Sequence, residues 1–167
     1  MGGDSAGADG WNIKNISCNK VFIKDHLIVG YTWSFRMGQI IEFSEDIPCF
    51  TNEFNNNSYA YLVKSFVPFI REKFKQEGFS TVKDNFETGG DFLIGLNGQL
   101  FEIQSDFAVL RSQDGYNSVG CGSFYALGAM AIMKLMENDP IRMIKKSLEV
   151  SEHFSNGVRS PFIILEL

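Results

Sequence analysis

The order of the predicted elements indicates an α+β fold in which two antiparallel sheets pack face to face and a pair of helices covers each outer face. Along the chain, short strands are followed by two helices, a hairpin, two more helices and a last strand. Helices that come in pairs between hairpins disfavour the alternating strand–helix units of a parallel sheet. The length of 167 residues and the hydrophobic content of 44% suit one domain over residues 1–167.

The first elements expected are a hairpin and the start of a helix. Residues 20–29, KVFIKDHLIV, hold two apolar runs around a polar turn, which is typical of two short strands. The segment RMGQIIEF, residues 36–43, predicts the beginning of a helix. Residues 45–58 contain Pro48 and three consecutive asparagines without periodicity, which predicts a surface loop.

A second helix is predicted over residues 59–77. Ser58 is its expected N-cap, and Gly78 is its expected stop. Pro68 lies inside the pattern and predicts a kink, because proline lacks the amide hydrogen of a helical hydrogen bond. The apolar residues at helical spacing are Leu62, Val63, Phe66, Ile70 and Phe74.

The next elements expected are a hairpin and a buried helix. In residues 92–103, Asn97 and Gly98 supply the positive φ angles that a tight hairpin turn needs. Residues 123–137 are apolar on nearly every face, which predicts a buried helix. Gly128 in the middle of this helix costs helix stability and therefore indicates a site of close packing.

The last elements expected are a helix over residues 140–155 and a strand over residues 162–167. Asp139 and Pro140 form an N-cap and first-turn pair for this helix, and Gly157 ends it. The chain has sixteen phenylalanines, which predict a bulky aromatic core.

Composition excludes several classes of function. The net charge is −5 and no basic stripe is present, so nucleic acid is not an expected partner, and no apolar run is long enough to cross a membrane. Cys18, Cys49 and Cys121 are an odd number at wide spacing, which predicts free thiols in a reducing, cytoplasmic compartment. His26 and His153 lie far from any cysteine pair, so no metal site is expected.

Asp4 and Lys20 are a candidate pair, sixteen residues apart. Taken singly, each has a plain interpretation, as a turn aspartate and as a solvated lysine at a strand edge. Buried together, they would form an ion pair that holds the lysine near a nucleophile. A nearby cation lowers the pKa of a nucleophile and so activates it.

The turn NSVGCGS is a second candidate, since Gly120 and Gly122 flank Cys121 directly before a helix. One interpretation is a tight turn that needs small residues. The other is a turn whose backbone N–H groups face a reaction centre. Cys121 could itself act as a nucleophile, but no histidine lies close to it in the sequence to activate it.

Together these segments resemble the N-terminal-nucleophile (Ntn) hydrolases of the proteasome β-subunit and HslV type over nearly the whole chain. GGDSAG resembles the glycine–aspartate turn of that family, and Lys20 follows at the spacing of its catalytic lysine. IVGYTWSFRMGQ resembles the strand-to-helix turn that supplies an oxyanion-binding amide, and VGCGSFYALGAM resembles the Gly-Ser-Gly turn and third helix. The resemblance implies a four-layer αββα sandwich.

The resemblance also implies a set of roles. In the family the nucleophile, usually threonine, is the first residue of the mature chain, on a strand before the glycine–aspartate turn. That strand is expected to precede residue 1, and the nucleophile's α-amine would act as the base. Asp4 and Lys20 would tune the site. The oxyanion and substrate would meet Trp33, Ser34, Gly120, Cys121 and Gly122, with Trp33 crowding the channel, and Asn156 and Ser160 would support the amine.

Two functions follow from the resemblance. One is a threonine-type, or serine- or cysteine-type, peptidase that acts on peptide or protein substrates without a metal or organic cofactor. Such a protein would form a homo-oligomer, in the form of a ring, with an ATP-driven partner. The alternative is a catalytically inactive structural subunit of the same fold. In either case residues 1–167 alone are predicted to show no peptidase turnover, because the thioether of Met1 cannot attack a carbonyl.

Overall fold

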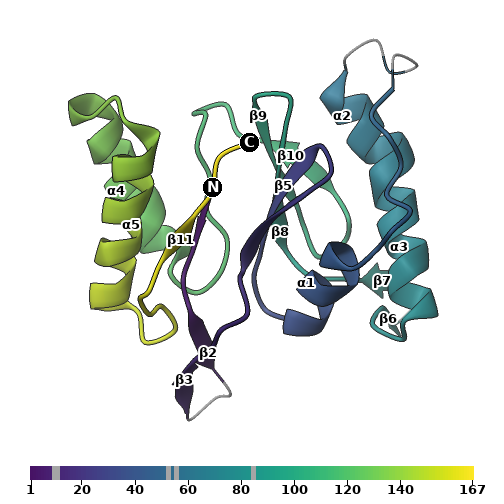
Figure 1. Ribbon diagram of the computed structural model, residues 1–167, viewed down its shortest axis with the longest axis horizontal. Coiled ribbons are helices and arrows are strands. Elements are labelled where there is room, and N and C mark those ends of the chain that lie inside the picture. The colour runs from purple at the N-terminus through teal and green to yellow at the C-terminus, as the bar shows by residue number, and fades with distance from the viewer. Residues whose placement is uncertain (9–11, 52–53, 55–56, 84–85) are drawn as a thin grey trace.

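The computed structural model describes residues 1–8, 12–51, 54, 57–83 and 86–167. Figure 1 shows four layers side by side: a pair of helices, a small sheet, a five-stranded sheet and a second group of helices. The αββα order predicted from the sequence is therefore confirmed. In the described part of the chain, however, the small sheet contains only the strands β1 (Gly2–Gly3) and β11 (Ile163–Ile164).

The five-stranded sheet is antiparallel throughout, in the order β10-β9-β8-β5-β4. Both predicted hairpins are present in it. Their turns contain Asp25 with a φ of 52°, and Asn97 and Gly98 with φ angles of 50° and 69°. The strands are β4 (Val21–Lys24), β5 (Leu27–Tyr31), β8 (Phe92–Leu96), β9 (Gln99–Ile103) and β10 (Val109–Arg111).

One outer layer contains α1 (Phe35–Glu42) and a long, interrupted helix. The long helix consists of α2 (Ser58–Tyr61), the π-helical turn η2 (Leu62–Phe66) and α3 (Val67–Gln76). Its N-cap is Asn57, whose Oδ1 accepts from the Ala60 N–H at 3.0 Å, so the expectation of Ser58 as the cap is wrong. Ser58 is instead the first helical residue, with a buried side chain. Pro68 lacks the amide hydrogen of a regular helical hydrogen bond. The π-helical turn directly before it is the local change of hydrogen-bond pattern that interrupts the helix there.

The core between this helical layer and the large sheet is aromatic, as the phenylalanine content predicts. The rings of Phe66 and Phe92 meet edge to face, with centroids 6.5 Å apart. The largest side chains that are fully buried are Tyr61, Phe66, Phe74, Phe92 and Phe101.

The other outer layer contains α4 (Ser123–Met136) and α5 (Pro140–Phe154). Asp139 caps α5 as predicted, since its Oδ1 accepts from the Ile141 N–H at 2.9 Å. The prediction of a buried helix over 123–137 is wrong, because α4 buries only Ala126 and Met130. A layer at the surface of a single chain is covered on its inner side alone. Gly128 does not pack closely either, because a Cβ there would meet no atom within 4 Å.

The remaining strands are short. The predicted strand over 162–167 is present as β11, which pairs antiparallel with β1, Gly2 lying opposite Ile164. Two hairpins were not expected from the sequence: β2 (Ala6–Ala8) with β3 (Ile13–Asn15), and β6 (Thr81–Lys83) with β7 (Phe86–Thr88). Of the predicted asparagine loop, Asn55 and Asn56 lie outside the described residues. No helix in the described ranges has the length and apolar character needed to span a membrane.

Candidate active site

Lys20 and Asp4 form an ion pair, as their spacing predicts. The Lys20 Nζ lies 3.1 Å from Asp4 Oδ1 and 3.0 Å from Asp4 Oδ2. Only 16% of the Lys20 side chain and 14% of the Asp4 side chain are exposed. The carboxylate contacts the ammonium with both oxygens and is largely shielded from water, so it fixes the position of the charge.

Three segments of the chain meet at this pair. Asp4 directly follows β1, and its Oδ1 accepts from the Ala6 N–H at 2.7 Å and from the Arg159 N–H at 3.4 Å. Lys20 directly precedes β4, and its carbonyl accepts from the Tyr31 N–H at 2.9 Å. The pair therefore joins the N-terminal turn, the loop after α5 and the edge of the large sheet.

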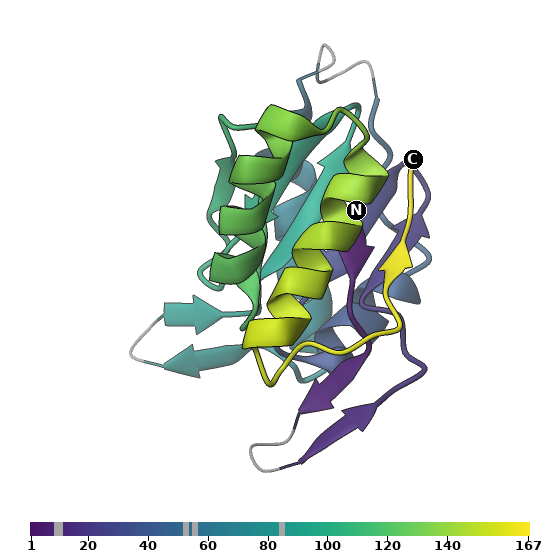
Figure 2. The same ribbon diagram turned by 90° about the vertical axis from the view of Figure 1, so that its left-hand side faces the viewer.

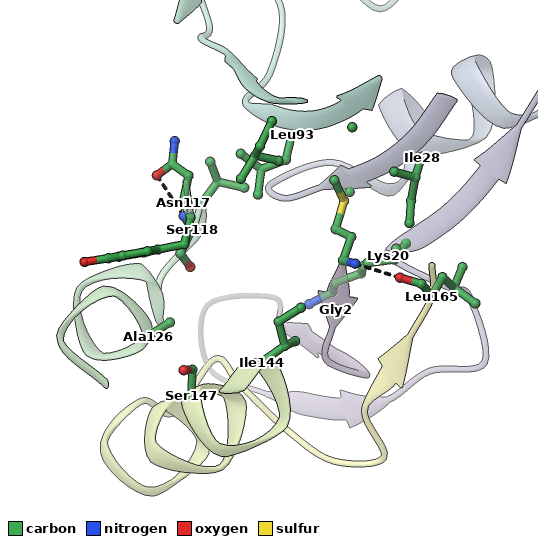
Figure 3. Close-up of a pocket in the computed structure, with 18 of the residues that line it drawn as sticks. Gly2, Lys20, Ile28, Leu93, Asn117, Ser118, Ala126, Ile144, Ser147 and Leu165 are labelled. Atoms are coloured by element: carbon green, nitrogen blue, oxygen red, sulfur yellow. Dashed lines mark hydrogen bonds between the residues drawn. The ribbon is translucent and has the colours of Figure 1, made fainter. Parts of the chain in front are cut away.

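A cavity of about 860 Å³, called here the inner cavity, lies between the large sheet and the helices α4 and α5 (Figure 3). Lys20 and Asp4 line it as well. Its two sides are mainly apolar, which suits an occupant with apolar groups on both faces. The sheet contributes Ile28, Gly30, Leu93 and Gly95, and the helices contribute Ala126, Met130, Ile144 and Leu148.

The strand β1 borders the inner cavity and has one edge that β11 does not cover. The Met1 nitrogen donates to the Leu165 carbonyl at 2.7 Å, and the Leu165 N–H donates back to the Met1 carbonyl at 2.9 Å. In an antiparallel ladder, the next residue then directs its N–H and C=O to the opposite side, so those of Gly2 point away from β11. Gly2 also lines the cavity (Figure 3). A strand added at this edge would continue the small sheet.

The part of the inner cavity beside the uncovered edge of β1 has room between α5 and the large sheet for one layer of strands. A Cβ on Gly2 would overlap Ile144 of α5. A Cβ on Gly3 would lie 2.8 Å from Cγ2 of Val21, which belongs to the large sheet. Since β1 lies directly between helix and sheet, its uncovered edge faces the space between the same two layers.

A second hollow of about 830 Å³, called here the outer cleft, shares part of its lining with the inner cavity. Its own lining is more polar, with the carboxylates of Asp91 and Glu102 and the hydroxyl of Ser105. Lys20 therefore lies where an apolar cavity meets a polar cleft. The residues common to both are Lys20, Tyr31, Thr32, Ser118, Val119, Gly120, Cys121 and Gly157.

Tyr31 is a neutral component of this junction. Burial, followed by the charges of Cys18 and Glu42, raises the pKa of the Tyr31 hydroxyl to about 12. The phenol therefore keeps its proton at neutral pH and adds no negative charge beside Lys20.

Residues 32–34 form a γ-turn at the outer cleft. The Ser34 N–H donates to the Thr32 carbonyl at 3.0 Å, and Trp33 between them has a φ of 76°. This backbone conformation is strained for a large side chain and suits glycine. The Ser34 hydroxyl accepts from the Met37 N–H at 3.4 Å and so caps α1. Because the Ser34 N–H already has an acceptor, the Trp33 N–H is the better of the two predicted oxyanion donors.

The turn at residues 120–122 packs against this γ-turn. Gly120 has a φ of 98°, and a Cβ there would lie 2.7 Å from Thr32 Oγ1, so the position requires glycine. The Gly122 carbonyl accepts from the Ser151 hydroxyl at 3.1 Å. The exposed thiol of Cys121 lies 3.8 Å from the Ser155 hydroxyl, a partner that cannot serve as a base for it.

The loop after α5 approaches the pair through a residue that sequence reasoning missed. Asn156 is exposed on this loop, and the Ser160 N–H donates to Glu152 Oε1 at 2.7 Å. The contact with Asp4 is made by the backbone amide of Arg159. A backbone amide leaves no signal in residue types, whereas the roles of Asn156 and Ser160 stay predictions.

Within the described ranges, no cluster of three or more histidine, cysteine or acidic side chains could hold a metal ion. Cys18, Cys49 and Cys121 are free and exposed. The groups at the junction include an ammonium, a carboxylate and a phenol, together with the hydroxyls of Thr32 and Ser118, the Cys121 thiol and backbone amides. The ammonium, the carboxylate and the amides can position and stabilise charge during acyl transfer.

Comparison with known proteins gives matches among solved structures. No protein-family model and no curated protein matches the sequence. BPH from Thiobacillus denitrificans, in complex with epoxomicin, is similar with a TM-score of 0.78 and 16% identity, over 97% of this chain and 88% of that chain. Eukaryotic HslV from Trypanosoma brucei is similar with a TM-score of 0.72 and 16% identity, over the same shares of 97% and 88%.

Anbu, the ancestral beta-subunit from Yersinia bercovieri, is similar with a TM-score of 0.59 and 17% identity, over 96% of this chain and 73% of that chain. At these identities the similarity establishes the fold. Together with the αββα layers, it shows that this chain has the HslV- and proteasome-like fold of the Ntn hydrolases.

Proposed function

We propose that this chain is the main part of an HslV-like Ntn peptidase that hydrolyses peptide bonds. The observation that carries the proposal is the position of the Lys20–Asp4 pair at the junction of the inner cavity and the outer cleft. An ion pair at this junction can activate a nucleophile that lies in the inner cavity and attacks a substrate in the outer cleft.

The nucleophile in this proposal is a threonine, serine or cysteine on a strand that precedes residue 1. The strand occupies the inner cavity and pairs with the edge of β1 that carries the Gly2 N–H and C=O. The apolar lining on both sides requires apolar side chains on both faces of the strand, apart from the nucleophile itself. The inner cavity beside β1 has room for one layer of strands, which supports a single strand in that place.

The proposed reaction uses the groups in sequence. The nucleophile's hydroxyl or thiol attacks the peptide carbonyl, and its own α-amine takes the proton and passes it to the leaving amine. The Lys20 ammonium favours the ionised nucleophile, Asp4 holds Lys20, and the Trp33 N–H donates to the developing oxyanion. Water then hydrolyses the acyl intermediate and restores the nucleophile.

The outer cleft is the proposed site for the substrate peptide. Gly120 and Cys121 line it with backbone and a small side chain, and the exposed Trp33 lines it as well, whereas Gly122 lines the inner cavity. The resemblance also supports a homo-oligomeric ring with an ATPase partner, and the exposed thiols support a cytoplasmic setting.

The test compares residues 1–167 with a protein extended by the codons that precede residue 1 in the gene. Only the extended protein is expected to cleave fluorogenic peptides and to react with epoxomicin, the compound bound by the similar BPH structure. Lys20→Met in the extended protein should lower kcat/KM by about a hundredfold or more. Lys14→Met, on the distant strand β3, serves as the control and should leave it unchanged.

Two results would contradict the proposal. Labelling of the short protein at Cys121 by epoxomicin or a thiol-directed peptide inhibitor would place the nucleophile on that turn. An extended protein that is folded and inactive, with the first strand paired to β1, would instead support the inactive structural subunit.

A further inference from the structure

The indole ring of Trp33 lines the outer cleft and is 79% exposed. Its backbone has a φ of 76°, a conformation that costs free energy for a large side chain. An exposed ring gains little from packing within the chain, so packing does not explain an aromatic residue at this position. Strained residues of this kind cluster at functional sites, which points to contact between the ring and a molecule in the cleft.

Asp91 is the backbone neighbour of this turn. Its carbonyl accepts from the Thr32 N–H at 3.3 Å, so Asp91 lies opposite the residue before Trp33. A Cβ on Gly90 would lie 3.5 Å from Cε3 of Trp33, so the ring lies along the segment that leads into Asp91. Asp91 also lines the outer cleft. The aromatic ring and this carboxylate therefore belong to the same part of the cleft.

Glu102 brings a second carboxylate to the same face of the large sheet. Side chains alternate along a strand, and Asp91 directly precedes β8, so its side chain lies on the face that carries Leu93. Glu102 of β9 lies opposite Leu93 in the sheet and shares that face. Asp91 and Glu102 are therefore diagonal neighbours, at a separation of roughly 7 Å between their β-carbons.

Both carboxylates keep their charge for a ligand. Glu102 accepts from the neutral amide of Asn117 at 2.7 Å. Within the described ranges, neither Asp91 nor Glu102 forms an ion pair. Lys20 is the cation among the described residues that line the cleft, and Asp4 already compensates its charge. The lining of the outer cleft therefore has uncompensated negative charge.

The outer cleft also has the size and the position for a peptide. Its volume is about 830 Å³, and its lining includes Ala6 and Ala8 of β2 and Thr88 of β7. Figure 2 shows the β2–β3 and β6–β7 hairpins at the same end of the molecule. The cleft therefore lies where these two hairpins leave the body of the molecule.

We propose that the outer cleft selects peptides in which a basic residue, above all arginine, supplies the scissile carbonyl. This inference rests on the proposed function, because it takes the Trp33 N–H as the donor to the oxyanion. The side chain of the residue whose carbonyl meets this N–H starts beside the Trp33 ring. Its guanidinium stacks on the ring and donates to the carboxylates of Asp91 and Glu102, a combination that suits arginine better than lysine.

The first test uses the extended protein and two fluorogenic peptides that differ only in arginine or citrulline before the scissile bond. Citrulline is a neutral side chain of nearly the same shape. The arginine peptide should have a kcat/KM at least tenfold higher. Asp91→Asn, Glu102→Gln and Trp33→Leu should each lower this ratio at least threefold. Glu72→Gln removes an equal charge from the exposed side of α3 and should leave the ratio unchanged.

The second test needs no nucleophile. The chain has two tryptophans, so Trp11→Phe leaves Trp33 as the only one in residues 1–167. Binding of a peptide amide should then change the fluorescence of Trp33, with a Kd at least tenfold lower for the arginine peptide than for the citrulline peptide. Added salt should reduce this difference, because it screens the charges. Circular dichroism checks that each variant is folded.

The two tests separate this inference from the proposed function. Equal kcat/KM values for the two peptides in an active extended protein overturn the inference and leave the peptidase intact. An inactive extended protein, with selective binding of the arginine peptide to residues 1–167, removes the peptidase and supports the charge selection. Equal Kd values in that case overturn both. An arginine preference that persists in Asp91→Asn and in Glu102→Gln overturns the role of these carboxylates.

Discussion

The Asp4 carboxylate and the Lys20 ammonium meet across the boundary between the two sheets, because Asp4 follows β1 and Lys20 precedes β4. Asp4→Asn should lower the free energy of unfolding by about 2–4 kcal/mol, since it leaves a largely shielded ammonium without its carboxylate. Urea denaturation measures the change. Asp46→Asn breaks the exposed pair with Lys73 and should cost less than about 1 kcal/mol. Equal losses in the two variants would show that the shielding of Lys20 has no effect.

Trp33 should be the site of a measurable backbone strain. Trp33→Gly is expected to raise the free energy of unfolding by up to about 1 kcal/mol, because glycine adopts a φ of 76° freely and the exposed ring contributes little packing. Trp33→Val should lower it by about 1–2 kcal/mol, because a branched Cβ is least tolerated at positive φ. A valine variant as stable as the glycine variant in guanidinium denaturation would contradict the strain.

Gly120 should tolerate substitution less well than another glycine with positive φ. Gly120→Ala is expected to lower the free energy of unfolding by about 3 kcal/mol, because the new Cβ meets Thr32 Oγ1 in addition to the unfavourable φ. Gly78 has a φ of 66°, and a Cβ there would meet no atom within 4 Å. Gly78→Ala should therefore lower the free energy of unfolding by only about 1 kcal/mol. The difference between the two thermal midpoints measures the contact with Thr32, and no difference would mean that the contact is absent.

His26 should make stability depend on pH. Burial lowers the pKa of the His26 imidazole below 6.5, with a smaller opposing effect of Asp25, and its Nε2 lies 3.0 Å from the Tyr61 hydroxyl. The unfolded chain then binds a proton at His26 more readily than the folded chain does. Stability from this group is complete above pH 6.5 and is lost as the pH falls from 6.5 through the folded pKa.

The measurement is the urea midpoint between pH 7.5 and pH 5, for the original chain and for His26→Asn. The original chain should lose more stability over this interval than the variant. A variant of His26 with the same pH dependence would contradict the assignment.

The parts of the fold that local signals determine could be predicted from the sequence. The Asn97–Gly98 turn and the Asp139 cap depend on residues within a few positions of each other. The strand β1 could not be predicted, because two glycines carry no side-chain pattern and their partners lie at the other end of the chain. The exposure of α4 could not be predicted either, because the sequence of a helix that is apolar on all sides does not show whether its own chain covers it.

The candidate site divides in the same way. Asp4 and Lys20 were found from their spacing and from the resemblance, and the structure brings them into contact. The γ-turn at Trp33 and the amide of Arg159 are properties of the backbone, which residue types do not reveal. The inner cavity depends on how three layers are spaced, and no single segment encodes it.

The pairing of β1 with β11 also determines when the site can form during synthesis. The strands of the large sheet all lie between residues 21 and 111, and its hairpins close through short loops, so this sheet can assemble while the ribosome is still making α4 and α5. The contact between Asp4 and Arg159 spans 155 residues, and the entropy of closing such a loop must be overcome in one late step. In a nascent chain stalled before residue 159, the large sheet would therefore be formed, but the Asp4 carboxylate beside Lys20 would lack the hydrogen bond from the Arg159 N–H.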